Sequence, residues 1–341
     1  MASSCAPDIS FAVACFNALP FLEDAILSAL RQEDVEVEVL IVDDGSSDAS
    51  VAVAQRLAEA DARVRLFQTP ENRGPAGARN IALAEMHGRW FAVLDSDDWI
   101  DPARSRILVA LADEQDADVV ADNLILFGDE QGERPLFAVS SGDAWQWLSL
   151  EAYFARSRLF ARQPGLGFLK PMIRQSFIER FRLRYNESLR IGEDDELVVR
   201  MLAAGARYAI IERPLYHYRK HLGSISHRLS VDHAERMLSA EREIREIIGP
   251  TAAARPAYRQ RWRALRRGVA FTRSVEALKH GKVGAALAAL LREPCAIPLY
   301  RYPISALHRR LSRRFSMNPE ARPGGASEVH SLANSSKEKR S

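Results

Sequence analysis

Short apolar runs alternate with amphipathic segments along the first 120 residues. Apolar runs of four to eight residues predict buried strands, here at residues 9–15, 35–42, 64–67 and 90–94. Residues 118–121 begin a further strand. Helical spacing of apolar positions separates them, at residues 20–32, 49–60, 76–86 and 102–114. This alternation predicts an α/β fold in which a mostly parallel, Rossmann-like sheet is flanked by helices.

Polar side chains follow three of these strands. Asn17 follows the first, Asp44 follows the second, and Asp95, Asp97 and Asp98 follow the fourth. In such sheets ligands bind beyond the carboxyl ends of the strands. Three carboxylates so close together repel one another unless a cation lies among them, and Mg²⁺ or Mn²⁺ would in turn bring a phosphate. The alternative is a solvated turn in which Asp97 or Asp98 caps the next helix.

The rest of the chain is less regular. Residues 145–162 are expected to be helical, with Trp145 and Trp147 in the core rather than on a sugar ring. An acidic loop at 190–195 opens a helix, and a strand follows at 208–211. From residue 231 the pattern is helical, residues 301–315 are basic and amphipathic, and residues 318–341 are expected to be disordered.

Charge is unevenly distributed over the 341 residues. Residues 251–341 hold 19 Lys and Arg against 5 Asp and Glu, although the net charge of the chain is only +2. A basic end on an acidic body predicts a polyanionic partner, and a membrane surface is favoured over nucleic acid because no nucleic-acid recognition motif is present.

Cysteine use and hydropathy indicate the compartment. Three unclustered cysteines fit a reducing environment and argue against disulfides or a cysteine zinc site. No basic segment precedes the first apolar run, and no apolar run approaches the roughly 20 residues of a membrane span. We expect a cytoplasmic protein that is peripheral at the inner membrane.

Five motifs resemble, in order, those of family 2 glycosyltransferases. They are residues 9–17, 40–48 (LIVDDGSSD), 72–80 (NRGPAGARN), 94–98 (LDSDD) and 192–194 (GED). The resemblance covers about residues 8–226 and is nearest to bacterial exopolysaccharide enzymes of the succinoglycan type. It implies an inverting enzyme with a GT-A fold. The predicted organisation is a GT-A domain at 1–228 (nucleotide-sugar half 8–122, acceptor half 123–228), a basic helical extension at 229–316 and a disordered tail at 317–341.

The resemblance implies a nucleoside-diphosphate sugar, most often UDP-linked, at the strand ends. Phe16 matches an aromatic residue that packs on uracil, and Asp44 matches the carboxylate that accepts the N3–H of the base. Asn17 and Asn72 match further donor-site positions, and Arg79 would face the phosphate or the base. The alternatives are that Asp44 is a turn acid capping the next helix and that Arg79 is a surface residue.

The resemblance also assigns a metal site. Asp97 matches the metal ligand of an Asp-x-Asp signature, with Asp95 near the ribose or the metal and Asp98 as an alternative register. His221 would complete the metal shell, and Arg219 would clamp phosphate. The ion, Mg²⁺ or Mn²⁺, would neutralise the charge that develops on the diphosphate.

Asp194 matches the catalytic base of the family. In an inverting displacement a carboxylate must take the proton of the attacking hydroxyl. The run of four acids from Glu193 to Glu196 leaves the register open, and these acids could instead stabilise a helix N-terminus.

The function predicted is an inverting, metal-dependent hexosyltransferase. The expected donor is UDP-glucose, and the expected acceptor is a polyprenyl-diphosphate-linked oligosaccharide in exopolysaccharide assembly. Alternatives are a transferase acting on lipopolysaccharide or another surface glycan, and a non-catalytic nucleotide-sugar binding module. A dinucleotide oxidoreductase is disfavoured because Cys15 to Ala18, after the first strand, contain no glycine-rich turn.

Overall fold

A computed structural model describes residues 6–140, 144–221 and 229–301. Its strands are β1 (Ile9–Cys15), β2 (Val37–Asp43), β3 (Val64–Gln68), β4 (Trp90–Val93), β5 (Trp99–Ile100), β6 (Val119–Phe127), β7 (Arg134–Pro135), β8 (Trp145–Trp147), β9 (Met172–Arg174) and β10 (Tyr208–Arg219). Its helices are α1 (Leu22–Leu30), α2 (Ser50–Ala60), α3 (Gly74–Glu85), α4 (Arg104–Glu114), α5 (Leu150–Arg156), α6 (Gln175–Phe181), α7 (Glu193–Ala203), α8 (Val231–Ala253), α9 (Pro256–Lys279) and α10 (Val283–Arg292), with 3₁₀ turns η1 (Leu166–Phe168) and η3 (Pro294–Tyr300).

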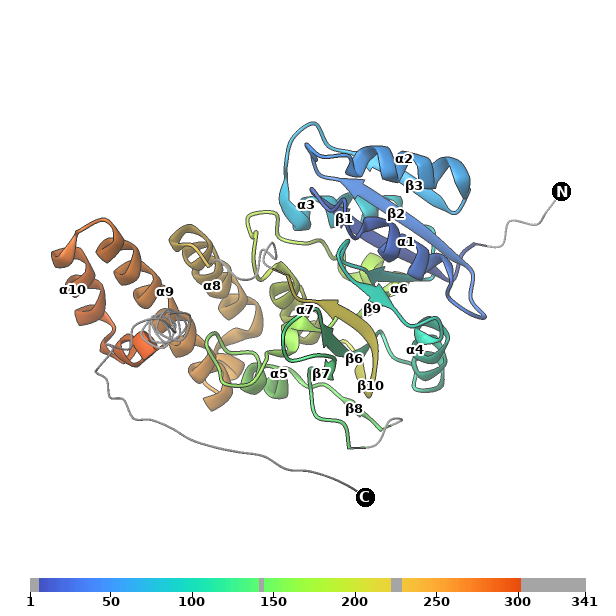
Figure 1. Ribbon diagram of the computed structural model, residues 1–341. Coiled ribbons are helices and arrows are strands. Elements are labelled where there is room, and N and C mark those ends of the chain that lie inside the picture. Colours follow the sequence, from blue (N-terminus) through green and yellow to red (C-terminus); the bar gives the residue numbers. More distant parts are fainter. Residues whose placement is uncertain (1–5, 141–143, 222–228, 302–341) are drawn as a thin grey trace, which may run out of the picture. The chain divides into compact units, whose positions relative to one another are not determined.

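The strands form one sheet of ten, which Figure 1 shows flanked by helices. The order is β3-β2-β1-β4-β9-β6-β10-β5, with β7 on β6 and β8 on β10. The longest pairings, β1 with β2 and β6 with β10, are parallel, whereas the short β9 lies antiparallel between β4 and β6. The predicted α/β class with a mostly parallel sheet is therefore confirmed.

The parallel strands place the polar motifs on one edge of the sheet. β1 lies between β2 and β4 and is parallel to both. The loops that begin at Phe16, Asp44 and Leu94 therefore leave the sheet side by side. Every residue of β2 and β4 is buried, as continuous apolar strands covered on both faces should be.

A buried ion pair ties α4 to the middle of the sheet. Arg104 and Asp122 have fully buried side chains, and Arg104 Nη2 donates to Asp122 Oδ1 at 2.8 Å. Arg104 Nη2 also donates to the Lys170 carbonyl oxygen at 2.7 Å. Burial raises the pKa of Asp122, and the adjacent guanidinium opposes that rise. The pair therefore fixes the backbone of a loop that reaches the functional site.

The predicted helix at residues 145–162 is confirmed only over α5 and is wrong on either side of it. Its first part is strand β8, which pairs with β10, and α5 begins only at Leu150. Ser149 sets that start because its side chain accepts a hydrogen bond from the Ala152 amide. Trp145 and Trp147 stand exposed, edge to face at 5.2 Å, so their expected core position is also wrong.

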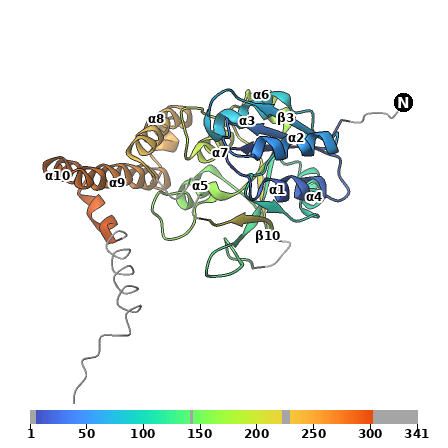
Figure 2. The ribbon, with the colours of Figure 1, turned by 45° about the horizontal axis from the view of Figure 1, so that its top comes forward.

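The C-terminal segment is helical, as predicted. α8 packs on α7, α9 packs on α5 and α8, and α10 packs on α9 (Figure 1, Figure 2). The described residues as far as Ile297 form one compact unit, and the predicted boundary at residue 228 stays a prediction. The predicted amphipathic segment at 301–315, except Arg301, and the predicted tail lie outside the described residues.

Hydropathy in the described ranges gives no single helix that could cross a bilayer. One bent pair, Val283–Arg292 with Pro294–Tyr300, meets the length and composition of a span only when both pieces are joined across an angle of 118°.

Candidate active site

A cavity of about 1030 Å³ lies beyond the carboxyl ends of β1, β2 and β4. Its far wall is formed by the start of α7, by α8 and by the loop at 157–165. Most of the predicted site residues line it, namely Phe16, Asn17, Asp44, Asn72, Arg79, Asp95, Asp97, Asp194 and His221. Asp98 and Arg219 are not among the lining residues.

Asn17 joins the loops that follow β1 and β2. Its φ of +51° lies in the left-handed region, which Asn tolerates better than most residues. Its Oδ1 accepts hydrogen bonds from the Ser47 amide at 2.8 Å and the Asp48 amide at 3.3 Å. Asn17 thereby holds its neighbour Phe16, whose ring is 46% exposed at the cavity.

Asp44 caps α3 rather than the helix that directly follows it in sequence. Its carboxylate accepts from the amides of Arg73 at 2.8 Å and Gly74 at 2.7 Å, and from the Thr69 hydroxyl at 3.1 Å. Gly74 has a φ of +82°, which favours glycine. Carboxylate oxygens carry about four acceptor sites, so Asp44 keeps capacity for a ligand donor.

Arg79 is buried, so its interpretation as a surface residue is wrong. Its Nη1 donates to Glu193 and to Asp194, both at 2.9 Å, and its Nη2 donates to Asp95 at 2.8 Å. One guanidinium on α3 therefore joins the acidic end of β4 to the start of α7. A planar donor fork suits such a junction better than an ammonium group would.

Lys170 is a site residue that sequence reasoning missed. Its buried Nζ lies 2.7 Å from Asp95 Oδ2 and 3.4 Å from Asp194 Oδ2. Burial lowers the pKa of Lys170, but the two carboxylates outweigh it and raise that pKa. The only local signal was a lysine beside Pro171 in an apolar loop, which does not identify an acidic partner.

Opposite electrostatic environments act on two of the strand-end acids. Burial raises the pKa of Asp95, but the opposing effect of Lys170 and Arg79 is larger and lowers that pKa to about 2. For Asp98, burial and the neighbouring carboxylates of Asp95 and Asp97 raise the pKa well above its usual range. The cations thus stand beside Asp95, while Asp98 is held by neutral donors.

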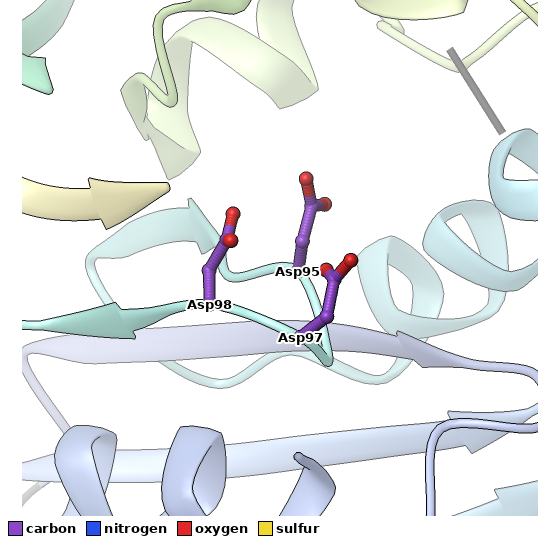
Figure 3. A group of neighbouring side chains, drawn as sticks. All are labelled: Asp95, Asp97 and Asp98. Carbon is purple, nitrogen blue, oxygen red and sulfur yellow. The ribbon is translucent and has the colours of Figure 1, made fainter. Parts of the chain in front are cut away.

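The acidic group suits a hard cation. Asp95, Asp97 and Asp98 each offer a carboxylate oxygen, all within 4.8 Å of one another, and project from one loop to the same side (Figure 3). Asp97 Oδ2 lies 2.7 Å from His221 Nε2. Asp98 accepts from the Tyr216 hydroxyl at 2.9 Å. An all-oxygen donor set fits Mg²⁺ or Mn²⁺.

The end of β10 closes one side of this group. Arg219 lies between the rings of Phe21 at 4.4 Å and Phe127 at 4.6 Å, and it donates its Nε to the Asp97 carbonyl at 2.8 Å. It therefore supports the acidic loop from outside the cavity, and its phosphate role stays a prediction. Ser224 and Ser226, which the family resemblance also suggests, lie outside the described residues.

The four acids at the start of α7 occupy different environments. Glu193 is buried, and burial together with Asp194 raises its pKa to about 7 against the opposing effect of Arg79. Asp195 accepts from the Tyr153 hydroxyl at 2.7 Å and is paired with Arg261 of α9. Asp194 pairs with Arg79 and Lys170, and Glu196 pairs with Arg200 at 2.7 Å, while all four acids line the cavity.

Comparison with known families agrees with this geometry. The family described as "Glycosyl transferase family 2" matches residues 10–181. The chain belongs to glycosyltransferase family 2. This enzyme is 37% identical over 309 residues to the succinoglycan biosynthesis protein ExoO of Rhizobium meliloti, with 91% of this chain and 88% of that protein covered. It is 33% identical to ExoU of the same organism, with 87% of each covered.

Solved structures show the same fold. The transferase resembles S. aureus TarS 1-349 in complex with UDP-GlcNAc, with a TM-score of 0.57, 16% identity, and coverage of 84% of this chain and 92% of that chain. It also resembles the mannosyltransferase PcManGT of Pyrobaculum calidifontis in complex with GDP-Man and Mn²⁺, with a TM-score of 0.53, 18% identity, and coverage of 92% and 84%. At these identities the likeness supports the predicted GT-A architecture.

Proposed function

We propose that this enzyme transfers a hexose from a UDP-sugar to an acceptor hydroxyl with inversion at the anomeric carbon, during exopolysaccharide assembly. One observation carries the proposal. A single cavity joins the strand-end pocket at Phe16 and Asp44, the acidic group at Asp95 and Asp97, and the carboxylate of Asp194. Relatives named for succinoglycan biosynthesis, and a TarS complex with UDP, support the acceptor class and the nucleotide.

Donor binding would use the loops after β1 and β2. Uracil would stack on the exposed ring of Phe16, a large flat surface with little conformational entropy to lose. The N3–H of the base would donate to Asp44, whose position is fixed by backbone amides. When bound at Asp95, Asp97 and Asp98, Mg²⁺ or Mn²⁺ supplies positive charge for the diphosphate.

Transfer would occur between the donor and α7. The acceptor oxygen attacks the anomeric carbon, the bond from that carbon to the diphosphate oxygen breaks, and UDP leaves. Asp194 takes the proton of the acceptor hydroxyl as attack proceeds. Arg79 and Lys170 hold the Asp194 carboxylate toward the cavity, at 2.9 Å and 3.4 Å.

The identity of the donor sugar, the acceptor and the location of the enzyme also belong to this proposal. The hexose is glucose from UDP-glucose, and the acceptor is an oligosaccharide on a polyprenyl diphosphate. Such an acceptor is anchored in a bilayer, so the enzyme would work at the cytoplasmic surface of the inner membrane. The basic C-terminal part supports this location.

Calorimetry of UDP binding with and without Mn²⁺ tests the donor site. We expect Mn²⁺ to tighten UDP binding, and Asp97→Asn to reduce this gain about tenfold, because one anionic ligand of the ion becomes neutral. Asp116→Asn, at an exposed acid outside the cavity, is the control and should behave as the native enzyme. Absence of UDP binding in either condition would contradict the proposed donor.

Stacking on Phe16 can be tested in the same assay. Phe16→Ala should weaken UDP binding about tenfold, since one base–aromatic stack contributes roughly 1–3 kcal/mol. Leu19→Ala removes a similarly exposed apolar side chain that does not line the cavity, and it should leave the affinity unchanged. Equal affinities for the two variants would show that the ring does not contact the base.

A further inference from the structure

Helix α10 carries an exposed apolar stripe. Val283, Leu287 and Leu291 recur every fourth residue and are 56%, 55% and 79% exposed, which places them on one face of the helix. The other face, centred on the buried Ala286, packs on α9. Side chains at this spacing are usually buried. The α10 stripe (Val283, Leu287 and Leu291) therefore lacks a cover among the described residues.

Cationic residues flank the α10 stripe along the chain. Lys279 and Lys282 precede the helix, Arg292 ends it, and the helix itself contains no acidic residue. Between residues 255 and 301 there are 11 Lys and Arg but only two acids, Glu276 and Glu293; of the 11 cations, Arg261 is buried and Lys279 pairs with Glu276 at 3.1 Å. A lysine at the N-terminus of a helix opposes the helix dipole, so Lys282 is not explained by helix stability. The combination of apolar stripe and cationic rim complements an anionic surface.

We propose that the α10 stripe inserts into the interfacial region of an anionic lipid bilayer. The helix would lie in the plane of the membrane, with the three apolar side chains among the acyl chains and the flanking cations at the lipid phosphates. The ten residues of α10 are too few to cross a bilayer, which takes about 20. This inference deepens the proposed function, since it rests on the proposal of a lipid-linked acceptor and names the surface that meets the membrane.

Vesicle sedimentation of the full chain tests the surface without donor or acceptor. We expect binding to vesicles that contain phosphatidylglycerol and much weaker binding to pure phosphatidylcholine. Leu291→Asp should lower the partition coefficient about tenfold, because an apolar contact is lost and a like charge meets the lipid. Leu291 is largely exposed, so this change should not affect folding. Ile247→Asp, a similarly exposed apolar position on α8, is the matched control and should change binding less than twofold.

Two outcomes would overturn the inference. The first is that Leu291→Asp binds vesicles as tightly as the native chain. The second is that it only converts a dimer to a monomer in light scattering, which would assign the stripe to contact between two copies. UDP calorimetry on the same samples separates the two proposals. If the native chain binds UDP but not anionic vesicles, the membrane surface alone is overturned. If it binds anionic vesicles but not UDP, the proposed donor alone is overturned.

Discussion

Asp194→Asn is expected to lower the rate of sugar transfer about 10³-fold, while UDP affinity stays within about twofold of native. The amide keeps the size of the side chain but cannot take a proton from the attacking hydroxyl. Asp194 lies in the first turn of α7 and pairs with Arg79 and Lys170. Asp195 pairs instead with Tyr153 and Arg261, and Glu196 pairs with Arg200. Arg79 and Lys170 also hold Asp95 of the acidic group, so among the four acids Asp194 is the one we propose as base.

Release of UDP in single turnover, with the donor that the native enzyme uses, measures this effect. Asp232→Asn, at an exposed acid of α8 that pairs with Arg236, serves as the control and should keep native activity. Glu193→Gln should cost less than Asp194→Asn, because Glu193 is buried against Arg79. If Glu193→Gln lowers the rate of sugar transfer more than Asp194→Asn does, Glu193 is the base instead of Asp194.

Arg261→Met is expected to lower the free energy of unfolding by about 3–5 kcal/mol. Arg261 lies on α9, is buried, and donates to Asp195 on α7 and to Glu241 on α8, the latter at 2.8 Å. Removing the guanidinium leaves the buried carboxylate of Glu241 and the partly buried carboxylate of Asp195 without this cation. The lost ion pair lies beside Asp194, because Asp195 is the next residue of the same helical turn.

Urea denaturation measures the stability difference. Arg263→Met changes an exposed arginine two residues away on the same helix and should alter stability by less than about 0.5 kcal/mol. Equal midpoints for the two variants would show that Arg261 contributes no more than a surface charge. The expected result makes the C-terminal helices part of the scaffold of the active site rather than an independent appendage.

Local patterns were sufficient to predict the sheet and the edge that carries the site. A buried parallel strand can be predicted from its own consecutive apolar residues. Neighbouring parallel strands place their carboxyl ends at one edge of the sheet, however far apart they are in the sequence. Asn17, Asp44 and Asp95 were therefore predicted to meet, and they line one cavity. The helix expected at residues 145–162 starts too early, because pairing with β10, a distant segment, makes its first part a strand, and only α5 is helical.

The sequence by itself determined the strand–helix alternation, the acidic strand ends and the family, because each is encoded within a few neighbouring residues. Only the tertiary structure decided which charges face one another. Lys170 meets Asp95, and Arg261 meets Asp195, across 75 and 66 residues of chain. Pairing at such separations depends on how helices and loops pack around the sheet, and no local spacing records it. The same packing gives the four acids from Glu193 to Glu196 different partners, although the sequence alone presents them as equivalent.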